Sequence, residues 1–146
     1  MQMAEFSSQQ AKFLRKLFSI APSSKGLAEP EAFLLQFVLF EASVRLVGRY
    51  YRERSGQKKK STAHESLNIE VVKRSLAYFS IPVSDERLVQ LVSSELRKRN
   101  QKSARKLRDG LAHQWNVEDR REVTDRFKDL TNGLAGVVDA IRMRAG

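Results

Sequence analysis

What this chain lacks narrows the chemistry open to it. It has no cysteine, which excludes disulfide bonds and thiolate-bound metals. Its only histidines, His64 and His113, are too few for most zinc sites, and we expect neither a metal nor another cofactor. It also has no long apolar run. The most apolar stretch, residues 33–40, is far too short to cross a bilayer, and Glu41 and Arg45 follow it closely.

No segment has the pattern of a signal peptide. Within residues 1–20, charged side chains lie inside the apolar stretch and not ahead of it. We therefore expect a cytoplasmic protein that does not associate with a membrane. A length of 146 residues predicts one domain, 1–146, large enough to bury roughly two thirds of its unfolded surface.

Proline and glycine are also scarce, and they mark the ends of the expected helices. No segment between turn residues alternates apolar and polar side chains as a β-strand would. The sequence therefore predicts an all-α fold of about five helices. We expect helices over residues 4–20, 30–54 and 68–79, a fourth capped by Ser84, and a last helix carrying an apolar stripe from Val123 to Ile141. The pattern leaves open whether the fourth helix ends near Asn100 or continues to Leu111.

Between the second and third expected helices, residues 55–66 predict a mobile basic loop. Gly56, three consecutive lysines and polar neighbours offer little apolar surface to bury. His64 falls in this loop, and we assign it to the surface.

The charge of this chain favours an anionic partner. Its formal net charge is +10, and residues 97–108 read RKRNQKSARKLR, with seven cations and no acid. Such a stretch is able to bind phosphates nonspecifically, although a solvated helix face has the same composition. The candidate RNA contacts in it are Arg97, Lys98, Arg99, Lys102, Arg105 and Lys106. A second basic cluster, residues 49–60, interleaves Tyr50 and Tyr51, and we favour a flexible solubilising role over RNA binding there.

At the end of the 97–108 stretch, Arg108 precedes His113 by five positions. An imidazole moves protons near neutral pH and a guanidinium holds phosphate oxygens, so the two suffice to cleave RNA without a metal. Five helical residues rotate by about 500°, which places the two side chains about 140° apart. Gly110 is able to kink or end the helix between them, and a symmetric dimer is another way to bring them to one phosphodiester. Alternatively, His113 is a helix-end histidine and Arg108 a solvated charge.

The longer string Leu107–His113 resembles the signature of the HEPN superfamily, in which an arginine and a polar residue precede a histidine by a few positions, ahead of a long last helix. Arg108, Asp109 and His113 match those positions. The resemblance implies an up-and-down helical bundle that dimerises, acting as a metal-independent endoribonuclease in toxin or antiviral defence systems. It implies that His113 is a general acid or base, that Arg108 holds the phosphate, and that Asp109 orients one of them.

The same resemblance implies RNA as substrate, a homodimer, and an antitoxin or defence-system protein as a further partner. In the toxin branch paired with nucleotidyltransferase antitoxins, a tyrosine that becomes modified follows the histidine by two positions. Here that position is Trp115, which has no hydroxyl group, so we do not expect that route of neutralisation. We favour a role for Trp115 in the core or a dimer interface, with stacking on a base as the alternative.

Glu41 stands inside the most apolar expected helix, where a carboxylate must find a partner or face a cleft. Arg45, one turn later, is the simplest partner. Alternatively, Glu41 points toward Arg108 and His113 and positions one of them. The sequence thus supports a HEPN-type ribonuclease, and the alternatives are a non-catalytic module that binds nucleic acid or protein and a subunit that docks through its last helix.

Overall fold

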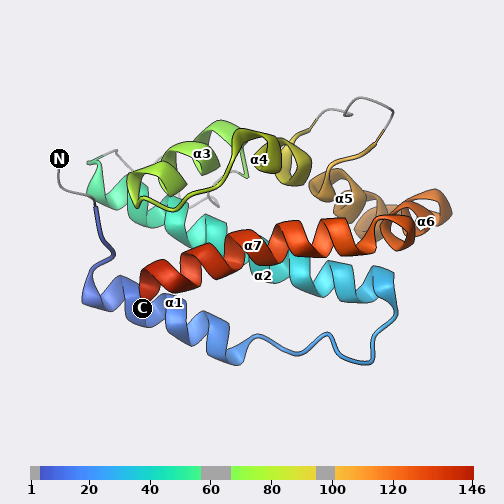
Figure 1. The fold of residues 1–146 in the computed structure, drawn as a ribbon, viewed down its shortest axis with the longest axis horizontal. Coiled ribbons are helices and arrows are strands. Elements are labelled where there is room, and N and C mark those ends of the chain that lie inside the picture. Colours follow the sequence, from blue (N-terminus) through green and yellow to red (C-terminus); the bar gives the residue numbers. More distant parts are fainter. Residues whose placement is uncertain (1–3, 57–66, 95–100) are drawn as a thin grey trace.

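A computed structural model of the chain describes residues 4–56, 67–94 and 101–146. Within these ranges the protein is built from helices alone, which confirms the expected all-α class (Figure 1). The helices are seven and not about five: α1 Ser8–Ile20, α2 Glu29–Arg54, α3 Ile69–Tyr78, α4 Asp85–Val92, α5 Ala104–Gln114, α6 Val117–Asp125 and α7 Phe127–Ala145.

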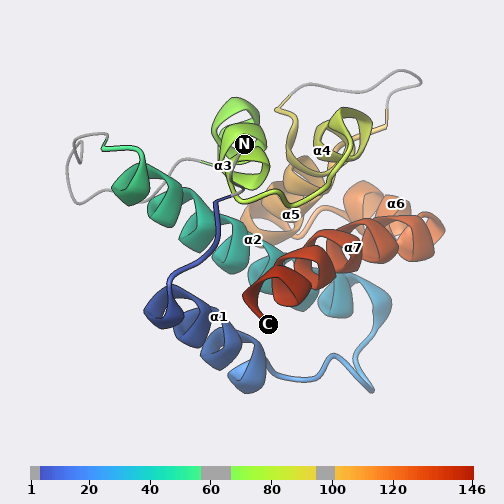
Figure 2. The same cartoon turned by 60° about the vertical axis from the view of Figure 1, so that its left-hand side comes forward.

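The two longest helices, α2 and α7, form the centre of the molecule. They run side by side in the same direction, with α1 on one side and α3 and α4 on the other, while α5 and α6 lie at the end where α2 begins (Figures 1 and 2). Apolar side chains surround much of α2, because helices pack against it from several directions. The large side chains that are fully buried in this pair include Phe33, Phe37 and Phe40 from α2, and Leu130, Leu134 and Ile141 from α7.

Local signals explain where the helices begin. Ser7 caps α1 and exchanges hydrogen bonds with Gln10, so α1 starts later than the expected residue 4. Ser84 caps α4 as expected, accepting a hydrogen bond from the backbone N–H of Arg87. Ser103 caps α5 in the same way through Lys106. Each of these three helices therefore begins at a side chain that accepts a hydrogen bond from one of its otherwise unpaired N–H groups.

Two expected boundaries were wrong. The fourth helix ends at Val92, earlier than either expected position, and α5 begins as a separate helix at Ala104. The expected last helix is divided at Arg126, which leaves helical geometry between α6 and α7. Arg126 Nη1 donates a hydrogen bond to the carbonyl oxygen of Lys102, 2.9 Å away, and so ties this break to the segment before α5.

The segment 4–7 is not helical, and it closes one end of the core. Phe6 packs against the rings of Phe79 and Tyr50, and Arg144 donates hydrogen bonds to the carbonyls of Ala4 and Phe79. Among the described helices, none is both long enough and apolar enough to span a membrane. Most of the expected mobile loop 55–66, including His64, lies outside the described residues.

Candidate functional site

The Arg108 guanidinium extends from α5 toward α2 and is held on three sides. Its Nε donates to Asp109 Oδ1 at 2.8 Å, and its Nη1 donates to Glu41 Oε1 at 2.5 Å. The Cζ atom of Arg108 lies 4.7 Å from the centre of the Phe37 ring, which is a cation–π contact. The side chain nevertheless remains 22 % exposed, so a fixed guanidinium still reaches solvent.

The Glu41 carboxylate joins two arginines. One oxygen accepts from Arg108, and the other accepts from Arg45 Nε at 2.9 Å and Nη2 at 2.7 Å. Both partners considered from the sequence are therefore present at once. Burial alone would raise the pKa of Glu41, but the hydrogen bonds from Arg45 and Arg108 outweigh it and lower the pKa below its usual 4.5. Glu41 is thus an anion at neutral pH.

The charge of Arg108 is equally well supported. Burial acts to lower the pKa of Arg108, but its hydrogen bonds to Glu41 and Asp109 outweigh burial and raise it. Toward the described residues, Arg108 donates through Nε and Nη1 only, and Nη2 makes no hydrogen bond to them. The remaining N–H groups of this fixed, planar guanidinium are thus left to donate to an anion, such as a phosphate.

His113 does not join this cluster within one copy of the chain. It is exposed in the last turn of α5, and no hydrogen bond or ion pair connects it to Arg108 or Glu41 in the described parts of the chain. Helix α5 continues through Gly110 to Gln114, so it does not end at that glycine, which was one of the possibilities left open by the sequence. On an ideal continuous helix, a spacing of five residues places these two side chains about 140° apart.

Gly110 has a packing role instead. A β-carbon at this position would overlap the carboxylate of Asp119 and lie 2.9 Å from its Cγ, so only glycine allows α6 to approach α5 this closely. Asp119 is 2 % exposed, and Lys102 Nζ lies 2.7 Å from its Oδ1. The sequence analysis missed this ion pair of a buried carboxylate. Its one signal was a glycine inside a helix, which often marks a close approach.

The cationic stretch before the motif contributes partly to the fold itself. Lys102 neutralises Asp119, and Arg105 Nη1 donates to the carbonyl oxygen of Leu67 at 2.8 Å. Lys106 is half-buried, and its ammonium has no partner among the described residues. The other three candidates, Arg97, Lys98 and Arg99, lie outside the described residues.

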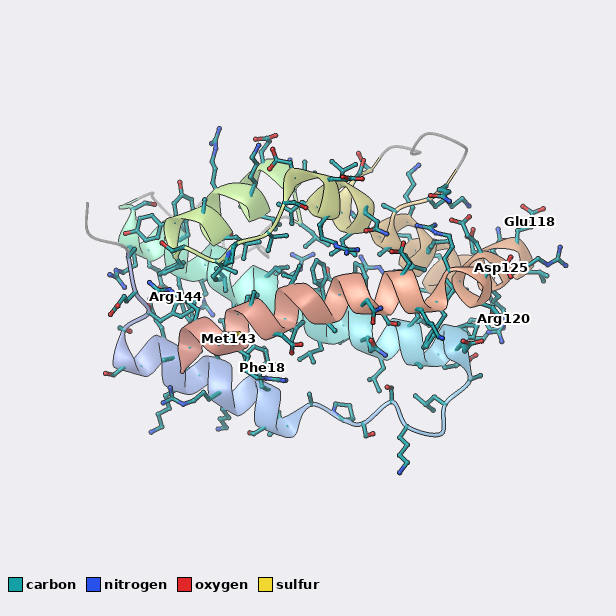
Figure 3. The ribbon with its side chains drawn as sticks, in the orientation of Figure 1. Phe18, Glu118, Arg120, Asp125, Met143 and Arg144 are labelled. Carbon is teal, nitrogen blue, oxygen red and sulfur yellow. The ribbon has the colours of Figure 1, made fainter. Side chains whose placement is uncertain are left out.

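Trp115 does not plug the core, contrary to one of the favoured sequence interpretations. It caps the end of α5 in the left-handed conformation, with φ 49° and ψ 45°, and is 49 % exposed. The Arg120 guanidinium stacks on the indole, 4.4 Å from its centre, and Arg120 Nη1 lies 2.8 Å from Glu31 Oε1. Figure 3 shows Arg120 at the end of the molecule where α2 begins.

A metal site is not formed by the described side chains, since no three histidine, aspartate or glutamate residues gather there as ligands would. The site thus offers a held guanidinium, an exposed imidazole on the same helix and an exposed, stacked indole. Comparison of the chain with models of protein families, with curated protein sequences and with solved structures finds no match.

Proposed function

We propose that this chain is a metal-independent endoribonuclease of the HEPN type, acting in the cytoplasm as a toxin or an antiviral effector. The observation that carries the proposal is the state of Arg108: Glu41 and Asp109 fix its guanidinium, yet part of its donor face remains available. His113 lies on the same helix with its side chain in solvent. A held cation and an accessible imidazole supply charge stabilisation and proton transfer, the two requirements for phosphodiester cleavage by a 2′-hydroxyl.

In the proposed reaction, the RNA 2′-oxygen attacks the adjacent phosphorus while the bond from phosphorus to the 5′-oxygen breaks. His113 either removes the proton of the 2′-hydroxyl or delivers a proton to the departing 5′-oxygen. Arg108 donates hydrogen bonds to the phosphate oxygens as negative charge grows on them. The products are a 2′,3′-cyclic phosphate and a 5′-hydroxyl, and DNA is not cleaved because it lacks the attacking group.

Glu41 and Asp109 are positioning residues in this proposal. They contact Arg108 and accept hydrogen bonds from it, which fixes the plane of the guanidinium before the phosphate arrives. Because Arg108 and His113 diverge on α5, we propose that a homodimer brings the histidine of one copy near the arginine of another. An antitoxin or defence-system protein that restrains the enzyme is part of the same proposal.

The test is cleavage of RNA in EDTA by the purified protein, with analysis of the product ends. We expect His113→Ala to lower the rate about 10²- to 10⁴-fold and Arg108→Ala to lower it about 10²- to 10³-fold. Both variants should retain the circular dichroism spectrum of the parent. Arg121→Ala, which removes an exposed cation from α6, is the control and should cleave normally. Undiminished cleavage by His113→Ala, or products without a cyclic phosphate, would contradict the proposal.

A non-catalytic module that binds nucleic acid or protein is the second candidate. The specific observation in its favour is that Arg108 already has two carboxylate partners and does not contact His113. On this hypothesis the arginine is a structural residue of the α2–α5 interface. RNA binding would then be salt-sensitive, would survive His113→Ala, and would not be accompanied by cleavage. Toxicity on expression that His113→Ala relieves would favour the ribonuclease.

A further inference from the structure

The conformation of Trp115 is unusual for its residue type. A helix end with positive φ is normally occupied by glycine or asparagine, because a β-carbon is strained there. Here a tryptophan takes φ 49° as the cap of α5 and leaves about half of its surface in solvent. Strained residues of this kind are often found at functional sites, so an exposed indole at this position calls for an explanation beyond packing.

The indole is also held in place. Arg120 from α6 stacks on it at 4.4 Å, and Glu31 from α2 pairs with Arg120. Side chains from α6 and α2 therefore fix a ring carried by the end of α5. Because Arg120 covers one face and Trp115 is still 49 % exposed, much of the remaining ring surface is open to a second planar group.

We propose that Trp115, supported by Arg120, stacks on an unpaired base of RNA and places the neighbouring phosphate close to His113. An open aromatic face beside a guanidinium is a surface on which bases of any sequence stack. Trp115 lies only two residues after His113, and the chain carries a net charge of +10 that attracts the phosphates of such a strand. The inference rests on the proposed function for its ligand, RNA, but not for cleavage.

Stacking on Trp115 requires a base that is free on at least one face. We therefore expect the protein to prefer single strands, loops and bulges over continuous duplex, in which bases stack on one another. The contact is expected to be tolerant of base identity, since every base has a π-face. Trp115 would thus select unpaired RNA and would leave the cleavage sequence to other contacts.

Because Trp115 is the only tryptophan in the chain, its fluorescence reports directly on this site. We would titrate the full-length His113→Ala variant, which keeps the RNA intact, with a single-stranded RNA, with the same sequence as a duplex, and with a single strand of abasic sites. The single strand should quench the emission and protect it from acrylamide. The abasic strand, which offers only phosphates and sugars, should bind without quenching. Binding of the single strand with unchanged emission would overturn the proposal.

Paired variants in the same background separate stacking from apolar contact and from charge. Trp115→Ala should weaken single-strand binding about 5- to 150-fold, while Val117→Ala, which trims a neighbour that is 69 % exposed, should not. Arg120→Ala should weaken binding more than Arg121→Ala, although both remove one positive charge. Equal losses within either pair would contradict a stacking role. So would a change in oligomeric state in Trp115→Ala with unchanged RNA affinity, because it would assign the indole to an interface between copies.

Cleavage by the unaltered protein distinguishes this inference from the proposed function. Cleavage without quenching would end the stacking proposal and leave the ribonuclease proposal standing. Quenching without cleavage would end the ribonuclease proposal and leave the stacking proposal standing. Trp115 would then belong to an RNA-binding module. The absence of both would overturn both.

Discussion

The Glu41 carboxylate determines where two guanidinium groups lie. Its oxygens are divided between Arg108 on α5 and Arg45 on its own helix, and its side chain is only 16 % exposed. A carboxylate in such surroundings is stable as an anion only because both partners are present. The same contacts that permit Glu41 in an apolar helix therefore orient the arginine of the proposed catalytic pair.

Glu41→Gln should lower the free energy of unfolding by about 1–3 kcal/mol at pH 7, because an amide replaces the charged acceptor of two arginines. The difference should depend on pH. The pKa of Glu41 is lowered in the folded protein, so its contribution to stability is fully present above the usual value of 4.5 and is lost as the pH falls through the folded value. The stabilities of the parent and of Glu41→Gln should therefore approach each other as the pH falls. Denaturant unfolding of both proteins at pH 7 and at several pH values below 4.5 measures this change.

Glu53→Gln is the matched control for that experiment. Glu53 and Arg49 are both about half exposed and 3.8 Å apart on the same helix, a pair of the kind that contributes little. Its substitution should change stability only slightly at any pH. A Glu41→Gln deficit that stayed constant down to low pH would show that lost packing, and not lost charge, causes it.

Contacts between residues that are close in sequence could be predicted. Contacts between distant residues could be predicted only where a side chain, such as a carboxylate in an apolar helix, needs a partner. Arg45 follows from its spacing to Glu41, and Arg108 from the need of a carboxylate in an apolar helix for a further partner or a cleft. The pair of Lys102 and Asp119 gave no such signal, because Asp119 stands among other charged residues on α6. The outward position of Trp115 also depends on a backbone conformation that tryptophan rarely adopts.

At the scale of helices, the approach of α6 to α5 depends on Gly110. Gly110→Ala should lower the free energy of unfolding by about 1–3 kcal/mol, because the added methyl group displaces the carboxylate of buried Asp119. Gly136→Ala on α7 is the control: its β-carbon meets nothing within 4 Å, so it should raise stability by roughly 0.5–1 kcal/mol through helix propensity. Thermal unfolding of both variants tests the opposite signs, and a stabilised Gly110→Ala would refute this account of the packing.

Two lysines on either side of the start of α5 should differ in their roles, one in the stability of the fold and the other in RNA binding. Lys102→Ala leaves the buried Asp119 carboxylate without its cation and should cost about 1–3 kcal/mol of stability. Lys106→Ala removes an ammonium that has no partner among the described residues, and should leave the melting temperature nearly unchanged. Its effect should appear instead as weaker RNA binding. Thermal melts and RNA titrations of both variants separate the roles, and equal melting temperatures would contradict the assignment of Lys102.

Helix positions were easier to predict than helix interruptions. The apolar spacing located α1, α2 and α3, and Ser84 located the start of α4. The break at Arg126 is different: Val123 on α6 and Leu130 on α7 are both buried, so the apolar stripe continues across it. A pattern that is unbroken in sequence cannot reveal a break fixed by a long-range hydrogen bond from Arg126 to the backbone of Lys102.

For the whole molecule, the net charge of +10 predicts how binding and cleavage differ in selectivity. Phosphates attract this chain in DNA and RNA alike, so single strands of equal sequence should bind with similar affinity. For each, log K should fall linearly with log salt, by about 0.7 per phosphate contacted. Only the RNA should be cleaved, because the attacking 2′-hydroxyl enters at the chemical step. Titrations from 50 to 200 mM salt, about a fourfold range, followed by cleavage assays on both strands, measure the two properties separately. Cleavage of the DNA strand would require an attacking group other than the 2′-hydroxyl and would contradict the proposed function. A salt-independent affinity would mean that apolar contacts dominate binding and would contradict the electrostatic account.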